Sequence, residues 1–460
     1  MQDRIEKYEI VKQLGKEIFA KSDVVKSGKV STQDIEIVKD FLKKAISLVK
    51  PAVLSLFFEH LIIAPELGKR LALKVKGVNQ NKIEFLLWLH DLGRIVDPGG
   101  YLRNDIIDDH LLLEFGLPKN IIQELPPVRT FLQIGNMLNL SELQLQGKEN
   151  LNQEQEKIAS DYFNLLTPTQ RIIFLADNFG KRDDGGKLFN LETFLQYVRT
   201  EKKRYAGDIN WATDRMQGGE ILGIYLVEKI LESLVTLKVD FEEILNSLSD
   251  YGPKFIIVVR HGLLHNPKNI AYNRDSNMKK EDWIGLSDLG KEKLRNLAKL
   301  IETRKFRINQ ILTSPETRTV ESLKSMNDIL RIQDTKIDED LDEIFAPGPY
   351  KEGLTIKFWE GIHGNTYDRN RWGSYNHEEV QTIIDRMNRV FWKAAKSLKK
   401  GEAAILVSHG DPIAWWINHQ ITGKEPDPAR QSELLYPAKG QAIVAILDSQ
   451  GKWFTHYLLN

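Results

Sequence analysis

The chain has 460 residues, which is too long for a protein with a single hydrophobic core. This length indicates two or three domains of about 150 residues each. Apolar residues make up 42% and charged residues 28%, the usage of a globular protein, which argues against large-scale disorder. Basic and acidic residues balance at 64 each, so the chain has no overall positive charge that would favour nucleic acid as a binding partner. It has no cysteine, which excludes disulfides, thiolate zinc sites and a catalytic Cys.

The N-terminal sequence MQDRIEKYEIVKQLGKE is charged and helical. It has neither the apolar stretch of a secretion signal nor the Arg/Ser-rich pattern of a transit peptide, so we expect a cytoplasmic protein. No apolar run reaches the roughly 18 to 20 residues that a bilayer-spanning helix needs. The longest runs, FIIVV and AILVS, have the length of buried strands, and no membrane partner is expected.

Apolar residues recur at spacings of three and four from Ile5 to about Leu248, the period of amphipathic helices. Examples in chain order are IVKDFLKKAISLV, IEFLLWLHDLG, IIFLADNF and ILGIYLVEKILESLV. The turn-forming sequence DYGP at residues 250–253 ends the pattern. The sequence therefore predicts an all-α domain over residues 1–250, with its core at about residues 30–200.

Beyond this turn, β-branched runs alternate with helical stretches, the arrangement of a mostly parallel sheet covered by helices. The strand candidates are FIIVV, NQILT, AAILVS and QAIVAIL, and the helical ones include DLGKEKLRNLAKLIETR and EEVQTIIDRMNRVFWKAAKSLKK. We expect residues 254–460 to form a three-layer α/β/α domain with a mostly parallel sheet. Two irregular segments, residues 335–349 and 350–376, are predicted to be functional loops at a pocket rim.

Basic side chains and histidines follow three of these strands where the strands end. FIIVV runs into Arg260-His261-Gly262, AAILV runs into Ser408-His409-Gly410, and NQILT runs into Ser314-Pro315, which precedes Arg318. Ligands of α/β sheets bind at the carboxyl ends of strands, so these side chains are expected to share one site. Arg318 falls in the first turn of a helix, where an anion is favoured.

Two histidines and two arginines suit phosphoryl transfer. An imidazole can attack phosphorus, while guanidinium groups and a second imidazolium neutralise the equatorial oxygens. A lone Arg-His-Gly tripeptide is more often structural than catalytic. Three elements in order, each placed after a strand, favour catalysis instead.

The set Arg260-His261-Gly262, Ser314-Pro315-x-x-Arg318-Thr319-x-Glu321 and Ser408-His409-Gly410 resembles the histidine phosphatase superfamily, also called the phosphoglycerate mutase-like family. The resemblance spans residues 254–460. It implies that His261 is the catalytic nucleophile, which becomes phosphohistidine, and that no cofactor is needed. It also implies a phosphate pocket completed by Arg260, Arg318 and the catalytic His409.

The same resemblance implies a carboxylic acid as proton donor. Leu341-Asp342-Glu343-Ile344 matches the family's Leu-x-Glu-Ile element, and Trp359-Glu360-Gly361 is similar to the element that follows it, so Glu343 is the expected donor. Asp411 is the alternative, because some branches keep the acid two residues after the second histidine. Asn266 lies one place earlier than the family's asparagine, and residues 267–282 do not match the usual substrate loop, so hydrolysis is favoured over mutase activity.

The helical half carries a second group of chemically active side chains: His60, the adjacent pair His90-Asp91, and Asp177. A single histidine on an apolar helix is ordinarily a core residue, but Asp91 between apolar neighbours is costly to bury without a cation. Imidazole and carboxylate together suit Mn²⁺, Fe²⁺, Co²⁺, Ni²⁺, Zn²⁺ or Mg²⁺. A site with open positions can generate a hydrolytic nucleophile from metal-bound water.

The order His, His-Asp, Asp, each in an apolar helix, resembles the HD-domain metal-dependent phosphohydrolases over residues 30–200. The resemblance implies an HD-type helical domain with one divalent metal ion as cofactor. The implied ligands are His60, His90, Asp91 and Asp177.

Three further side chains stand near these ligands in the sequence. His110 falls where two-metal members carry another histidine, and it is expected to contact phosphate or to form part of an incomplete second site. Lys181 and Arg182 either attract a phosphorylated substrate or form a solvated helix end.

These patterns predict a two-domain phosphohydrolase that acts on small phosphorylated substrates such as nucleotides or sugar phosphates. The alternative is that the HD half is a metal- or nucleotide-binding regulatory module and only the histidine phosphatase is active. A role in nucleic-acid processing is disfavoured by the neutral net charge and by the lack of an aromatic-basic stripe.

Overall fold

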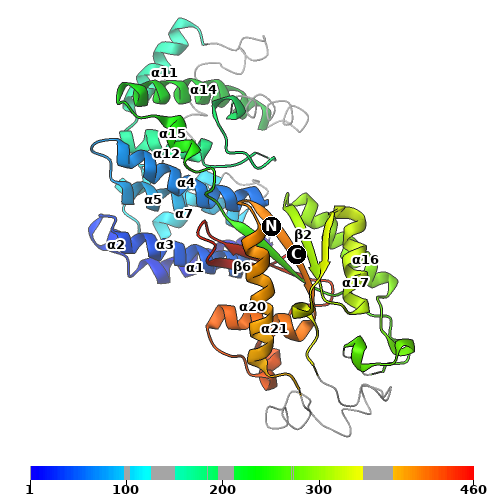
Figure 1. Cartoon of the computed structure of the whole chain (residues 1–460). Coiled ribbons are helices and arrows are strands. Elements are labelled where there is room, and N and C mark those ends of the chain that lie inside the picture. The colour runs from blue at the N-terminus through cyan, green and yellow to red at the C-terminus, as the bar shows by residue number, and fades with distance from the viewer. Residues whose placement is uncertain are drawn as a thin grey trace. The chain divides into compact units, whose positions relative to one another are not determined.

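The computed structural model of the chain describes residues 2–97, 104–125, 151–183, 185–194, 212–270, 272, 274–345 and 377–459. The chain divides into two compact units, Met1–Gly252 and Pro253–Asn460, which we describe separately. Figure 1 shows helices in the first unit and a sheet with helices in the second. Within the described residues, no helix is long and apolar enough to cross a membrane.

The described part of the first unit consists of helices and their connections, with one isolated antiparallel bridge between Arg182 and Leu188. Its helices are α1 (Gln2–Phe19), α2 (Asp23–Ser27), α3 (Thr32–Val49), α4 (Ser55–Lys74), α5 (Gln80–Leu89), α6 (Leu92–Val96), α7 (Asn104–Glu114), α8 (Lys119–Ile122), α11 (Gln153–Leu165), α12 (Pro168–Phe179), α14 (Ala212–Thr236) and α15 (Phe241–Asn246).

Helices α4, α5 and α12 pack closely, and small residues allow it. A Cβ atom at Gly68 of α4 would lie 2.2 Å from the Leu87 side chain of α5, and one at Gly180, after α12, would lie 2.4 Å from Ala64 Cα. Thr167 starts α12 with a capping box that pairs it with Gln170, and Pro168 occupies the first turn. These contacts bring the ends of α5 and α12 to the middle of α4.

The second unit contains a six-stranded sheet in the order β3-β2-β4-β1-β5-β6. The strands are β1 (Lys254–Arg260), β2 (Arg307–Thr313), β3 (Asp334–Ile337), β4 (Glu402–Ser408), β5 (Ala442–Leu447) and β6 (Trp453–Leu459). The pairs β1–β4, β2–β4 and β2–β3 are parallel, whereas β1–β5 and β5–β6 are antiparallel. The predicted mostly parallel sheet is therefore corrected to a mixed sheet, because β5 runs against both of its neighbours.

Helices cover both faces of this sheet, α16 and α17 on one side and α20 and α21 on the other (Figure 1). Their bounds are α16 (Asp288–Thr303), α17 (Thr317–Leu330), α20 (Val380–Ser397) and α21 (Gly410–Thr422), and short 3-10 helices lie at η1 (Asp275–Asn277), η2 (Lys280–Asp282), η3 (Glu339–Leu341) and η6 (Pro428–Glu433). Alternate strand residues such as Ile256 and Val258 pack with Trp415 and Phe391 in one core. This alternation follows from the two-residue period of a strand.

All four predicted strands are present, whereas β3 and β6 were not predicted. The four residues of β3 are mostly exposed, so the strand has no buried run to mark it. The predicted irregular segment 335–349 begins inside β3 and contains η3 before Glu343. The second predicted loop, residues 350–376, lies outside the described residues.

Candidate active sites

The three predicted strand-end segments of the second unit are adjacent. β1 and β4 pair in parallel with Arg260 opposite Ser408, so both strands end at the same edge. The His261 N–H donates to Ser408 O over 3.0 Å, and the Ser314 N–H donates to the main chain of β4 over 3.1 Å. The ring centroids of His261 and His409 lie 5.4 Å apart. The fold therefore gathers these side chains at one edge.

His261 is buried, and its hydrogen bond identifies the tautomer. Nδ1 lies 2.9 Å from Gly262 O, and because a carbonyl oxygen only accepts, Nδ1 carries the proton and the Nε2 lone pair is left for attack. Burial, followed by the positive charges of Arg318 and Arg260, lowers the pKa of His261 well below its ordinary value. The ring is therefore neutral, as a phosphoryl acceptor must be.

A chain of hydroxyl groups orients His409, which is also fully buried. Thr319 Oγ1 donates to Glu316 O over 2.8 Å, so it accepts the Ser314 hydroxyl at 2.7 Å, and Ser314 Oγ in turn accepts from His409 Nε2 at 2.8 Å. His409 Nδ1 has no hydrogen-bond partner among the described residues. Burial and the charge of Arg318 lower the pKa of His409 well below its ordinary value, so a negative ligand is needed to favour its protonation.

Two arginines present unused donors beside these histidines. Arg318 is completely buried, yet neither its Nε nor its Nη2 has a hydrogen-bond partner in the described part of the chain, and the same holds for Arg260 Nε. Arg260 Nη1 donates to Pro437 O over 3.0 Å, and its guanidinium lies 4.8 Å from the centre of the Tyr436 ring. Buried donors are seldom left unpaired in a folded protein. These guanidinium groups are buried donors without acceptors in the described part of the chain, and they lie beside His409 Nδ1, a buried nitrogen that also lacks a partner there.

Glu343 lies beside these donors and holds a proton readily. Its Oε2 is 3.4 Å from His409 Nδ1 and 3.6 Å from Arg318 Nη2. Burial, followed by the negative charge of Asp411, raises the pKa of Glu343 to about 7 against the opposing effect of Arg318. Asp411, the alternative acid, accepts the Tyr436 hydroxyl at 2.8 Å. The geometry and pKa favour Glu343 as a general acid.

Tyr436 and Lys439 were not predicted as site residues, and they reach the site because β5 is antiparallel to β1. The start of β5 lies at the carboxyl end of β1, where the Gly440 N–H donates to His261 O over 2.9 Å. Lys439 Nζ lies 3.2 Å from the Tyr272 hydroxyl, and its charge contributes to the lowered pKa of His261. To place them here from the sequence, one would have had to know that the strand QAIVAIL pairs antiparallel to β1.

The first unit gathers its four predicted metal ligands from three segments. His60 belongs to α4, His90 and Asp91 follow α5, and Asp177 is in α12. His60 Nε2 and His90 Nε2 are 2.8 Å apart, and Asp177 Oδ1 is 3.2 Å from each of them. Asp91 Oδ2 lies 3.5 Å from His60 Nε2 and 3.8 Å from His90 Nε2, without a hydrogen-bond partner among the described residues.

These side chains fit a divalent cation. His60 Nδ1 and His90 Nδ1 face the carbonyls of Gly180 and Leu87 at 3.1 and 2.6 Å, so both carry protons there and both Nε2 atoms point inward as ligand atoms. Ligands about 2.1 Å from one octahedral ion lie roughly 3 Å apart, which matches the observed separations. The Asp177 side chain is 42% exposed, so the site is open to solvent on that side.

The two histidines of this group differ in their pKa. Burial lowers the pKa of His60. Burial acts in the same direction on His90, but the carboxylates of Asp91 and Asp177 outweigh it and raise the pKa of His90 to about 9. A cation that binds between the two Nε2 atoms therefore displaces a proton.

Other predicted residues lie elsewhere or have other partners. His110 is exposed on α7 and makes no hydrogen bond or ion pair with the four ligands, whereas Asp108 of the same helix accepts the Gly93 N–H at 2.5 Å. The Arg182 guanidinium donates to Gly186 O, Ser249 O and Tyr251 O, so it braces the chain at the end of the unit instead of forming a solvated helix end. Trp359-Glu360-Gly361 lies outside the described residues.

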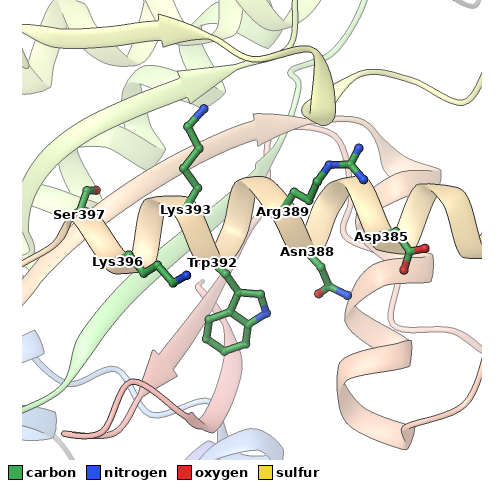
Figure 2. Close-up of a pocket in the computed structure, with 7 residues that line it drawn as sticks. All are labelled: Asp385, Asn388, Arg389, Trp392, Lys393, Lys396 and Ser397. Atoms are coloured by element: carbon green, nitrogen blue, oxygen red, sulfur yellow. The ribbon is translucent and has the colours of Figure 1, made fainter.

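A hollow lined by residues of α20 includes none of these site residues. Figure 2 shows the residues that line it, which are Asp385, Asn388, Arg389, Trp392, Lys393, Lys396 and Ser397. Arg389 and Lys393 point away from Trp392 and pair with Asp340 and Asp338 at 2.7 and 3.1 Å. Since these cations have internal carboxylate partners, we assign the hollow no function.

Comparison with known proteins bears on the second unit. Residues 256–455 match the family model of the histidine phosphatase superfamily (branch 1). No curated protein matches the chain.

Solved structures similar to part of the chain include Bacillus stearothermophilus YhfR, at 18% identity over 44% of this chain and 94% of that one, with a TM-score of 0.36. The α-ribazole phosphatase from Shigella flexneri is 17% identical over 45% of this chain and 96% of that one, with a TM-score of 0.36. A mycobacterial glucosyl-3-phosphoglycerate phosphatase is 17% identical over 43% and 95%, with a TM-score of 0.34. The family match, together with the mixed sheet and its helices, identifies residues 256–455 as a domain of the histidine phosphatase superfamily.

Proposed function

We propose that the second unit hydrolyses phosphate monoesters through a phosphorylated His261. The observation that carries this proposal is the group of guanidinium donors on Arg260 and Arg318 that lack acceptors among the described residues, beside His409 and the free Nε2 of His261. A phosphate ester supplies several oxygen acceptors and the negative charge that these groups lack. Binding of a phosphate ester would therefore give these donors their acceptors.

The reaction divides into two displacements at phosphorus. In the first, His261 Nε2 bonds to phosphorus, the bond from phosphorus to the ester oxygen breaks, and Glu343 gives its proton to the leaving oxygen. In the second, water attacks phosphorus, gives its proton to the Glu343 carboxylate, and the bond to Nε2 breaks. Arg260, Arg318 and protonated His409 stabilise the charge on the phosphoryl oxygens in both steps.

Replacing Glu343 with glutamine is expected to slow alkyl phosphates by about 100-fold while p-nitrophenyl phosphate slows only a few-fold. An alkoxide leaves poorly without a proton, whereas nitrophenolate does not need one. Because the pKa of Glu343 is about 7, wild-type kcat/KM for alkyl phosphates should fall as the pH rises above 7. Steady-state kinetics with both substrates measure these effects. A larger leaving-group dependence in Asp411→Asn would assign the acid to Asp411.

We further propose that the first unit is an HD-type metal-dependent phosphohydrolase that acts on nucleotides or related phosphate esters. The supporting observation is the convergence of four ligand atoms, with the Nε2 atoms of His60 and His90 only 2.8 Å apart and Asp177 partly open to solvent. A divalent ion bound there supplies a water of lowered pKa and polarises a phosphate oxygen. The chain's own part is to orient both imidazoles through the carbonyls of Leu87 and Gly180.

A phosphatase screen with and without chelator tests both proposals. The substrates are nucleotides and sugar phosphates, assayed with the full chain after loading with Mn²⁺, Co²⁺, Ni²⁺, Zn²⁺ or Mg²⁺. Activity that survives the chelator is expected from the second unit, and activity that disappears is expected from the first. If every substrate were hydrolysed equally with and without chelator, the first unit would be a regulatory module.

A further inference from the structure

The main chain of Glu343 is held by two arginines from different parts of the second unit. Arg274 Nε donates to Glu343 O over 2.7 Å, and Arg386 Nη2 donates to the same oxygen over 3.3 Å. Arg274 precedes η1, whereas Arg386 is a buried residue of α20. Two charged donors on one carbonyl oxygen are a strong restraint on the position of that peptide.

Glu378 holds both arginines in turn. Its Oε1 accepts from Arg386 Nε at 2.8 Å, and its Oε2 accepts from Arg274 Nη2 at 3.0 Å. The same carboxylate accepts the Phe345 N–H at 3.1 Å, and the Glu378 N–H donates to Phe345 O over 2.8 Å. The carboxylate therefore has partners on both arginines and on the chain two residues beyond Glu343.

The chain before Glu343 is fixed by the same arginines. Arg386 Nη1 donates to Asp340 O over 2.8 Å, and Arg274 Nε lies 3.3 Å from Asp342 Oδ2. The Glu343 carboxyl itself has weaker restraints among the described residues, because Oε1 accepts the Ile344 N–H at 3.1 Å, while Oε2 is 3.4 Å from His409 Nδ1 and 3.6 Å from Arg318 Nη2. The direction of the carboxyl is thus set mainly by where the main chain lies.

We propose that Arg386, Arg274 and Glu378 are positioning residues that hold the proton donor in line with the leaving oxygen, which rests on the proposed role of Glu343. They do not touch the phosphoryl group, which Arg260, Arg318 and His409 bind. Proton transfer needs hydrogen-bond distance between Glu343 and the leaving oxygen, and a displacement of about 1 Å can reduce the rate about 100-fold. Losing this restraint should therefore affect substrates that need a proton and spare those that do not.

The test compares Arg386→Gln with Arg389→Gln, two arginines of α20 that are three residues apart. Arg389 pairs with the Asp340 carboxylate but makes no bond to Glu343, so it is a matched control. We expect Arg386→Gln to lower kcat for an alkyl phosphate by about 10- to 100-fold and kcat for p-nitrophenyl phosphate by less than about threefold. Arg389→Gln should change neither, and Arg386→Lys should recover part of the loss.

A variant that fails to fold can be distinguished from a folded variant in which Glu343 is displaced. Circular dichroism melts identify a variant that does not fold, and Glu378→Gln, which keeps the shape of the side chain, then takes the place of Arg386→Gln with the same expected pattern. Equal losses on both substrates in a folded variant, or no loss, would overturn the proposal. Glu343→Gln, assayed in parallel, separates the two ideas: if it shows no leaving-group dependence, the role of Glu343 fails, and if it alone shows one, only the positioning role fails.

Discussion

Replacing His261 with alanine is expected to abolish the chelator-resistant phosphatase activity, with a loss of about 10⁴-fold or more. His261 Nε2 is the free nucleophilic atom of the site, because Nδ1 is bound to Gly262 O and the low pKa keeps the ring neutral. His409 cannot take its place, since its Nε2 donates to Ser314 Oγ and its neighbour Glu343 occupies the side of Nδ1. Without Nε2 there is no covalent intermediate, and water must attack the ester directly.

Labelling measures this directly. A substrate with labelled phosphate should leave acid-labile label on the wild-type protein and none on His261→Ala. His265→Ala is the matched control, because His265 is exposed four residues farther along the chain and should keep both label and turnover. Full chelator-resistant turnover by His261→Ala would show that the nucleophile is another residue.

Replacing Asp91 with alanine is expected to remove the metal ion from the first unit. Asp91 Oδ2 is a buried acceptor without a hydrogen-bond partner among the described residues, and it lies within 3.8 Å of both histidine Nε2 atoms. Its loss takes away one of two negative charges that offset the cation, and the chelator-sensitive activity should go with it. Because an ion that binds only the folded state stabilises it, addition of metal should raise the Tm of the wild type but not of the variant.

Elemental analysis and thermal melts with and without chelator measure these effects, with His110→Ala as a control that should keep its metal. We expect close to one divalent ion per wild-type chain and a small fraction of that in Asp91→Ala. Equal metal content near zero in both proteins would mean that the HD-like half is catalytically silent. The regulatory alternative would then replace the proposed phosphohydrolase activity.

The residues of the second unit that carry its chemistry could be predicted from local sequence patterns. The runs FIIVV and AAILV are apolar and β-branched without interruption, which marks a strand buried on both faces, and each ends abruptly at a histidine. Where such strands end follows from local composition, so Arg260-His261 and Ser408-His409 could be placed at strand ends without a structure. In the first unit, His60, His90, Asp91 and Asp177 could be grouped by their helical context, and their function stays a prediction.

The direction of β5 could not be predicted in this way, because an apolar run specifies a strand but not whether it pairs parallel or antiparallel to its neighbours. That direction carries Tyr436 to Arg260 and Asp411, and Lys439 to the neighbourhood of His261. The contacts that hold the main chain of Glu343 could not be predicted from the sequence either. Arg274, Glu378 and Arg386 are separated by up to 112 positions, and no sequence pattern distinguishes any of them from other charged residues. Side chains with no local pattern come together only through packing, so the sequence could predict the reacting groups but not what holds them in place.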